Sequence, residues 1–342
     1  MCELLGLSFN KPVRPQISFT GFRERGRNNP HGWGLAFYQD KAAQIFKEPL
    51  KAGGSNLAEF VQDYREISSK LFISHVRLSS VGGESYKNTH PFRRVLNGKE
   101  YIFAHNGTLR KFRTLKTGRF LPLGGTDSEH VFCHLLHCIE QRKISDWKER
   151  DFTWLNSKLK EINKYGRFNC LFSNGEFMFC YHDVKGYNGL FFVHRKPPYS
   201  DDAICLKDKD WQIQLSREKS PEETGFVIAT RPLTDEDWHS FIPGSLVIFK
   251  GGKRVFGHKN FYFSEEKQVL KILRNSPHKV ALKSIIRKSH APEKLIKSTI
   301  KSLCSKEWIR QDGRDTVGWD DGEANYYTLR NFREKIDKII SG

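Results

Sequence analysis

The chain has 342 residues, of which 38% are hydrophobic and 13% aromatic, and this length is enough for one large domain or two. The formal net charge is +18, which favours either a polyanionic partner or simply a basic surface. The chain has no apolar run of about 18 residues, no secretory signal and seven scattered cysteines without a Cys-x-x-Cys pair, features that argue against a membrane span, a disulfide framework and a zinc ribbon. We therefore expect a cytoplasmic protein with no membrane partner.

Up to about residue 258, short runs rich in Phe, Ile, Val and Tyr are punctuated by Gly, Asn and Pro, which predicts many β-strands. The runs are 32–40, 70–80, 100–107, 169–183, 190–195, 225–230 and 245–258, and the sequence SNGE at 173–176 predicts a hairpin turn. Two segments, 56–71 and 125–142, carry apolar residues at helical spacing and are predicted helices. Strands and helices that do not strictly alternate indicate an α+β fold, with antiparallel sheet covered by helices.

After residue 263 the pattern changes to three short helical segments, 264–276, 278–290 and 291–309, followed by a predicted hairpin. Ser264 is a predicted cap of the first segment, and Pro292 lies near the first turn of the third. Three helices and a hairpin form the outline of a winged-helix-like module over 259–342, separate from a domain over 2–258.

The third helical segment carries Lys294, Lys297 and Lys301 on one face. Such a stripe is suited to nucleic-acid phosphates. It is equally typical of a solvated helix face, and winged helices also serve as dimerisation or docking modules.

Cys2 stands directly behind the initiator methionine. If Met1 is removed, one carbon carries both a thiol and a free α-amine, whose reference pKa of about 7.7–8.0 lets it accept the thiol proton. Attack on an amide carbonyl then needs fixed donors for the developing oxyanion, and the side chain of Asn106 with the backbone N–H of Gly107 offers two. Arg77 and Asp127 are suited to the carboxylate and the ammonium of an amino-acid substrate.

Each of these residues alone has a commoner explanation. Asn-Gly is a turn dipeptide, a basic protein has many surface arginines, and an Asp before a helix is often its cap. Three histidines suggest a metal or triad set, His75, His90 and His105, but histidines at strand ends usually satisfy local hydrogen bonds. A different cysteine paired with a histidine is another catalytic alternative, although Cys133 and Cys138 lie in an apolar helix and resemble core residues. We expect no metal site and no cofactor.

The ordered set of motifs is more specific than its members. Cys2, followed by HGWG, SHVRLSS, NTHPF, FAHNG and GTDSE, resembles the class II glutamine amidotransferases, and among them the stand-alone YafJ-like and Dug3-like subgroup. The resemblance continues through 226–249 and so covers about residues 2–258. It implies an N-terminal-nucleophile (Ntn) hydrolase αββα sandwich.

The resemblance also implies a role for each site residue. Cys2 would be the nucleophile exposed by removal of Met1, and Asn106 and Gly107 would form the oxyanion hole. Arg77 would hold the carboxylate of glutamine, and Asp127 its α-amine.

The implied reaction is cleavage of the γ-amide of glutamine to glutamate and ammonia, or of a γ-glutamyl compound such as glutathione to glutamate and the amine that was bonded to it. The sequence contains no P-loop, Rossmann fingerprint or other nucleotide signature. Either an ammonia-accepting partner protein takes the product, or the enzyme simply hydrolyses its substrate. The alternative function is a glutamine-sensing regulator that binds nucleic acid through 259–342.

Overall fold

The chain forms two compact units, residues 1–258 and 259–342. The computed structural model describes residues 2–25, 29–78, 81–197, 199, 203–205, 212–214, 219–257, 264–276, 278–289, 293–305, 308–312, 325–328 and 336–337. Each unit has its own hydrophobic core, so each is described by itself. None of the described helices is long and apolar enough to cross a membrane.

The larger unit contains a seven-stranded antiparallel sheet with β1 (Glu3–Val13) at its centre. Its strands lie in the order β13 (His239–Ser240), β9 (Phe191–Arg195), β12 (Gly225–Ala229), β1, β4 (Ser69–Val76), β2 (Trp33–Gln39) and β3 (Ala42–Glu48). Because side chains alternate along a strand, Leu5, Leu7 and Phe9 share one face of β1. On that face they form one core with residues of α1 (Gln16–Arg25) and α2 (Asn56–Asp63).

The second sheet of this unit is six-stranded and also antiparallel. Its order is β15 (Lys253–Phe256), β14 (Leu246–Lys250), β8 (Met178–Tyr181), β7 (Gly166–Ser173), β6 (Lys99–Leu109) and β5 (Phe92–Leu96). The helices α3 (Asp127–Gln141) and α4 (Glu149–Asn163) share a core with it that is rich in Phe and Leu. Short elements complete the unit: η2 (Ala52–Gly54), η3 (Tyr86–Asn88), η4 (Phe112–Thr114) and the pair β10 (Ala203–Cys205) and β11 (Gln212–Gln214).

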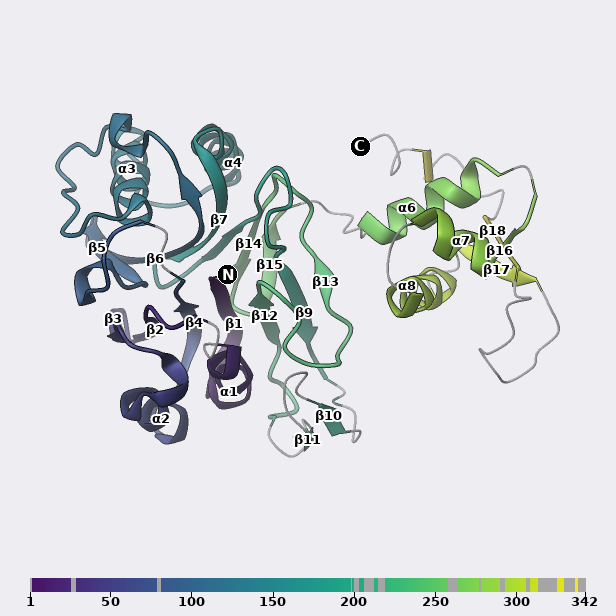
Figure 1. Cartoon of the computed structure of the whole chain (residues 1–342), viewed down its shortest axis with the longest axis horizontal. Helices are drawn as coiled ribbons and strands as arrows, with labels where there is room; N and C mark the ends of the chain where they lie inside the picture. The colour runs from purple at the N-terminus through teal and green to yellow at the C-terminus, as the bar shows by residue number, and fades with distance from the viewer. Residues whose placement is uncertain are drawn as a thin grey trace. The chain divides into compact units, whose positions relative to one another are not determined.

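The two sheets stack face to face between the two helical layers (Figure 1). A Cβ on Gly6 of the first sheet would lie 3.1 Å from Leu171 Cδ1 of the second, so the sheets approach closely there. At another point of the interface, the rings of Phe226 and Phe249 lie 4.4 Å apart. The unit is therefore a four-layered αββα arrangement within a mixed α+β fold.

The described residues of the smaller unit form three helices and a three-stranded sheet. Its elements are α6 (Ser264–Arg274), β16 (Val280–Ala281), α7 (Leu282–Ser289), α8 (Glu293–Ser305), β17 (Ile309–Asp312) and β18 (Asn325–Thr328), with β18 between the other two strands. Ile296, Ile300 and Leu303 of α8 are buried in the unit's own core, as their spacing predicts. The predicted hairpin is confirmed as the antiparallel pair β17–β18.

The predicted strands and the hairpin turn before β8 are confirmed, but three details of the larger unit are wrong. The helix predicted over 56–71 ends at Asp63, because Ser69–Val76 instead forms the strand β4, which pairs with β1 and β2. The helices α1 and α4 were not predicted, nor were the strands β1, β3, β5, β10, β11 and β13. The strand that ends at Gly107 in the prediction continues to Leu109, so Asn106 and Gly107 form no turn.

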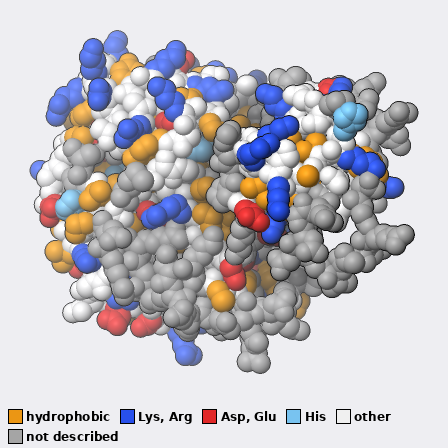
Figure 2. Space-filling model, turned by 45° about the vertical axis from the view of Figure 1, so that its right-hand side comes forward, with side chains coloured by type: hydrophobic (Ala, Val, Ile, Leu, Met, Phe, Trp, Pro, Cys, Tyr) orange, Lys and Arg blue, Asp and Glu red, His pale blue; other side chains and the backbone are white. Residues whose placement is uncertain are grey.

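The described Lys and Arg side chains lie at several places on the face that Figure 2 shows. In the view of Figure 2 the Lys and Arg side chains are distributed across the visible face, and acidic side chains lie among them. The net charge of +18 is therefore not gathered into one patch on this face.

Candidate active site

Cys2 immediately precedes the central strand β1. Its Sγ accepts a hydrogen bond from the Leu78 amide at 3.0 Å and donates to the Leu78 carbonyl oxygen at 3.1 Å. Burial raises the pKa of the thiol, while the Leu78 hydrogen bond and the charge of Arg77 act in the opposite direction. A thiol with a raised pKa is protonated at neutral pH and needs a base before it can attack.

Strand register brings Arg77 beside Cys2. In the β1–β4 ladder Glu3 pairs with Val76, so Cys2 and Arg77 are the next residues beyond the pairing in an antiparallel arrangement. The two side chains consequently emerge at the same end of the sheet.

The Arg77 guanidinium is buried and bonded to a neighbouring loop. It donates to the carbonyl oxygens of Val81 at 3.0 Å and Gly82 at 3.1 Å. Burial lowers the pKa of Arg77, and interactions with Cys2 and Asp127 act to raise it. Arg77 is thus within electrostatic reach of both residues.

Asn106 reaches Cys2 from the second sheet, and Gly107 follows it on β6. Asn106 Nδ2 donates to the Cys2 carbonyl oxygen at 2.7 Å. A Cβ on Gly107 would lie 2.0 Å from the Arg167 carbonyl oxygen and 2.6 Å from His105 Nε2, so no larger residue fits without displacing the backbone. Asn106 and Gly107 lie within the strand β6 and form no turn. The glycine instead allows the backbone of the neighbouring strand β7 to approach closely.

Asp127 is the first residue of α3, and the predicted helix entrance is confirmed. The cap itself is Thr126, whose Oγ1 accepts from the Glu129 amide at 3.1 Å. The Asp127 carboxylate instead accepts from the Leu109 amide at 2.7 Å and the Ser128 amide at 2.9 Å. Its position fixes the end of β6 against the start of α3.

Two asparagines that the sequence reasoning missed also shape this region. Asn188, between β8 and β9, donates from Nδ2 to the Cys2 carbonyl oxygen at 2.9 Å. Asn88 donates to the Gly83 carbonyl oxygen at 3.0 Å and accepts from the Gly125 amide at 2.9 Å. Asn88 thereby joins the loop that Arg77 bonds to the loop before Asp127. Its place in the NTHPF motif is the sequence feature that could have identified it.

The three candidate histidines lie close to the site but do not bond Cys2. The rings of His75 and His90 lie 4.2 Å apart, and among the described residues their ring nitrogens have no hydrogen-bond partner. Burial lowers the pKa of His75 to about 3 and that of His90 well below its ordinary value. His105 is held by Ser128 Oγ at 2.8 Å and the Arg167 carbonyl oxygen at 3.2 Å.

Helix α3 contains a further pair of histidines four residues apart, His130 and His134. Each ring has one nitrogen at hydrogen-bond distance from a backbone carbonyl oxygen. His130 Nε2 lies 2.9 Å from the Leu115 carbonyl oxygen, and His134 Nδ1 lies 2.7 Å from that of Lys116. In the part of the chain that the structure describes, no three metal-binding side chains are grouped. Cys133 is fully buried, as its apolar helix predicts, whereas Cys138 is only partly buried.

Comparison with known proteins gives a consistent result. The family model of glutamine amidotransferases class-II matches residues 1–269. YafJ of Escherichia coli, provisionally named a glutamine amidotransferase, is 39% identical over 261 residues, which cover 75% of this chain and 100% of that protein. An uncharacterised protein of Methanocaldococcus jannaschii is 47% identical over 349 residues, which cover 100% of this chain and 97% of the relative.

Among solved structures, the 2.0 Å crystal structure of a predicted glutamine amidotransferase from Pseudomonas aeruginosa PA01 is similar, with a TM-score of 0.55 and 31% identity. The match covers 75% of this chain and 100% of the other. The archaeal relative therefore matches the chain through the smaller unit, whereas the bacterial proteins match three quarters of it. The family match over most of the chain shows that this protein belongs to the class II glutamine amidotransferases.

Proposed function

We propose that, once Met1 is removed, the protein cleaves the γ-amide of glutamine or of a γ-glutamyl compound, with Cys2 as the nucleophile. The observation that carries this proposal is that Asn106 bonds the Cys2 carbonyl, while the charge of Arg77 acts on Cys2 and that of Asp127 acts on Arg77. A thiol, a cation, an anion and an amide donor are the groups that hydrolysis of an amino-acid amide requires.

The substrate would be held by its charged end. Arg77 would receive the α-carboxylate, using guanidinium donors that now bond the Val81 and Gly82 carbonyls. Asp127 would receive the α-ammonium through the lone pairs that the Leu109 and Ser128 amides leave open. Binding at Arg77 would thus compete with the loop that contains residues 81–83.

The chemistry would proceed through a thioester. The free α-amine of Cys2 takes the thiol proton, Sγ attacks the amide carbon, and the oxyanion is met by Gly107 N–H and the second N–H of the Asn106 amide, whose first N–H bonds the Cys2 carbonyl. The α-ammonium returns its proton to the leaving nitrogen, which departs as ammonia from glutamine or as the free amine from a γ-glutamyl compound. Water, deprotonated by the same amine, then cleaves the thioester to glutamate and restores the thiol.

The finer identity of the substrate follows from the subgroup resemblance rather than from geometry. YafJ-like relatives support glutamine, and a γ-glutamyl peptide such as glutathione is the second candidate. With no nucleotide-binding signature in the sequence, ammonia would be released or passed to a partner protein.

For the smaller unit we infer a winged-helix-like module. Its helix, short strand, two helices and hairpin, with β18 between β16 and β17, support this inference. The regulator alternative gains no comparable support. Lys297 of the lysine stripe pairs with Glu293 at 3.0 Å, and the side chain of Lys294 lies outside the described residues.

The test is glutamate release by the full chain, whose intact mass first establishes that Met1 is absent. We expect release from glutamine or glutathione, its loss in Cys2→Ala and its retention in Cys205→Ala, a partly buried cysteine on β10 that serves as the matched control. Release from neither substrate by the Met1-trimmed chain, or release that persists in Cys2→Ala, would overturn the proposal.

A further inference from the structure

The carbonyl group of Cys2 is held by two side-chain amides. Asn106 Nδ2 lies 2.7 Å and Asn188 Nδ2 lies 2.9 Å from the Cys2 carbonyl oxygen. The regular pairing of β1 begins only at Glu3, so the sheet does not hold the Cys2 carbonyl. Its orientation depends on these two amides.

Asn188 itself is presented by the loop after β8, which is bonded to the start of β7. Asp183 Oδ2 accepts from the Phe168 amide at 2.9 Å, and its Oδ1 from the Lys185 amide at 2.8 Å. Asn169 donates to the Tyr187 carbonyl oxygen at 2.6 Å. The loop is thereby tied at both ends to the start of β7.

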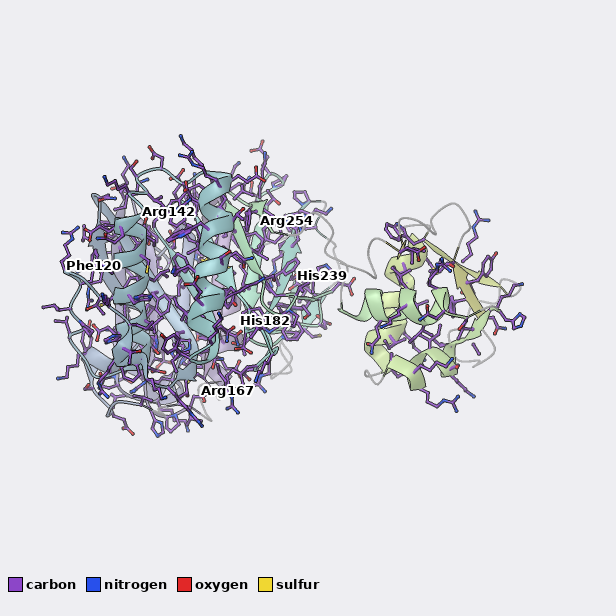
Figure 3. The ribbon with its side chains drawn as sticks, turned by 90° about the horizontal axis from the view of Figure 1, so that it is seen from above. Phe120, Arg142, Arg167, His182, His239 and Arg254 are labelled. Carbon is purple, nitrogen blue, oxygen red and sulfur yellow. The ribbon has the colours of Figure 1, made fainter. Side chains whose placement is uncertain are left out.

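Aromatic and histidine contacts add to this anchoring. The Arg167 guanidinium lies 4.7 Å from the centre of the Tyr187 ring, and His182 Nδ1 lies 2.9 Å from the Phe241 carbonyl oxygen; both Arg167 and His182 are labelled in Figure 3. Asn188 has a φ of 55°, a left-handed conformation that few residues other than Gly and Asn adopt readily. The loop is built to hold an asparagine at this place.

We propose that Asn188 is a positioning residue for the nucleophile, an inference that rests on the proposed function. Its amide and that of Asn106 fix the carbonyl of Cys2, and through it the rotation of the α-amine and Sγ on the same residue. Asn188 does not touch the reacting atoms. Its effect is to keep the α-amine and Sγ of Cys2 correctly placed relative to the amide carbon of the substrate. A displacement of about 1 Å in such a site can lower the rate by roughly 10²-fold.

Two variants separate the amide from the backbone conformation. Asn188→Gly keeps the left-handed backbone at no steric cost and removes the donor. Asn188→Asp keeps the shape but replaces the donor with a carboxylate beside Cys2. The matched control is Asn97→Asp, because Asn97 also has a left-handed φ, 52°, and its amide donates to the Ile144 carbonyl oxygen at 3.1 Å.

We expect Asn188→Gly to lower kcat by about 10-fold, the equivalent of one hydrogen bond, with KM nearly unchanged. In Asn188→Asp the added carboxylate favours the protonated amine and the protonated thiol. Its acidic limb of activity should therefore move to higher pH, whereas Asn97→Asp should keep the wild-type profile.

The other charged groups near Cys2 stay the same in each variant. The charge of Arg77 interacts with Cys2. Arg77 in turn interacts electrostatically with four other ionisable groups, His75, Glu84, His90 and Asp127. A shift confined to Asn188→Asp therefore reports the new carboxylate.

A second readout does not depend on any substrate. The probe 2-cyanobenzothiazole condenses with a free 1,2-aminothiol, so its rate with the full chain reports the amine and thiol of Cys2 directly. We expect the pH dependence of condensation to move upward in Asn188→Asp and to stay unchanged in Asn97→Asp. If the wild type condenses with the probe but releases no glutamate, the proposed function fails while this readout still decides the role of Asn188.

The positioning role is overturned if both Asn188 variants keep the wild-type kcat and both pH profiles. It is also overturned if Asn97→Asp shifts the profiles equally, because the effect would then be general to asparagine in such turns. A kcat loss in Asn188→Gly without a shift in Asn188→Asp would point to a purely structural role for the loop and would equally overturn it.

Discussion

Acid should destabilise the larger unit through His75. This residue of β4 is fully buried, its ring lies 4.2 Å from that of His90, and neither of its ring nitrogens has a hydrogen-bond partner among the described residues. Protonation would place a bare positive charge between the sheets, close to Arg77. For this reason burial, followed by the charge of Arg77, lowers the pKa of His75 to about 3.

The size of the effect follows from the two pKa values. In the unfolded chain His75 titrates near its ordinary value of about 6.5, so below that pH the unfolded state binds a proton that the folded state does not. Stability is therefore complete above about pH 6.5 and declines as the pH falls toward 3. At about 1.36 kcal/mol per pH unit, the loss from His75 alone at pH 5.0 is roughly 2 kcal/mol.

The assay is denaturant unfolding of the wild type and of His75→Gln, which does not titrate, at pH 7.5 and 5.0. We expect the wild type to lose about 2 kcal/mol more than the variant between the two pH values, whatever the variant's stability at pH 7.5. The control His278→Gln, an exposed histidine of the smaller unit, should behave as the wild type. Equal losses in wild type and His75→Gln would show that His75 is not held neutral in the folded protein.

Two further predictions concern residues of the candidate site. Gly107→Ala places a Cβ 2.0 Å from the Arg167 carbonyl oxygen, so it should lower Tm by several degrees and abolish glutamate release. The control Gly54→Ala has open space around its Cβ and should change neither. Thermal unfolding and an activity assay check both variants. Asp127→Asn removes the anion offered to the substrate ammonium and should reduce kcat/KM for glutamine by roughly 10- to 100-fold, the value of a hydrogen bond to a charged group. The surface variant Asp146→Asn, whose side chain is 84% exposed, should keep the wild-type value, and an Asp127→Asn enzyme with unchanged kcat/KM would remove Asp127 from the binding role.

Much of the fold could be predicted because its signals are local. Strand runs such as 225–230 and 245–258 are rich in apolar residues and bounded by turn residues, so the strands themselves could be predicted, whereas their partners could not. The helix α2 was predicted too long because Tyr64 and Ile67 continue its helical spacing, and a short apolar window suits both a helix and a strand. The pairing of β4 with β1 and β2 decides between them, and that is a long-range fact.

The residues of the candidate site also fall into two groups, those that the sequence could suggest and those that it could not. Cys2, Arg77, Asn106, Gly107 and Asp127 could be proposed because each belongs to an ordered family motif. Their roles remain proposals that the variants above test.

Asn188 could not be proposed from the sequence. In "GYNGL" it looks like an ordinary turn residue, and its partner Cys2 is 186 positions away. The meaning of Asn106-Gly107 was likewise hidden, because the local preference of the dipeptide for turns is overridden by the continued pairing of β6 with β7.

The central place of β1 has a consequence for the protein's synthesis. β1 pairs on one side with β4 and on the other with β12, and the Leu4 amide bonds to Thr230, 226 residues later. Translation must therefore produce most of the larger unit before the first strand is enclosed, and contacts of such long range form slowly. If Met1 is trimmed, as the proposed function requires, trimming has that interval in which to act on an unpaired terminus. A fusion partner placed ahead of Cys2 would then abolish the free amine, whereas one placed after residue 342 would not.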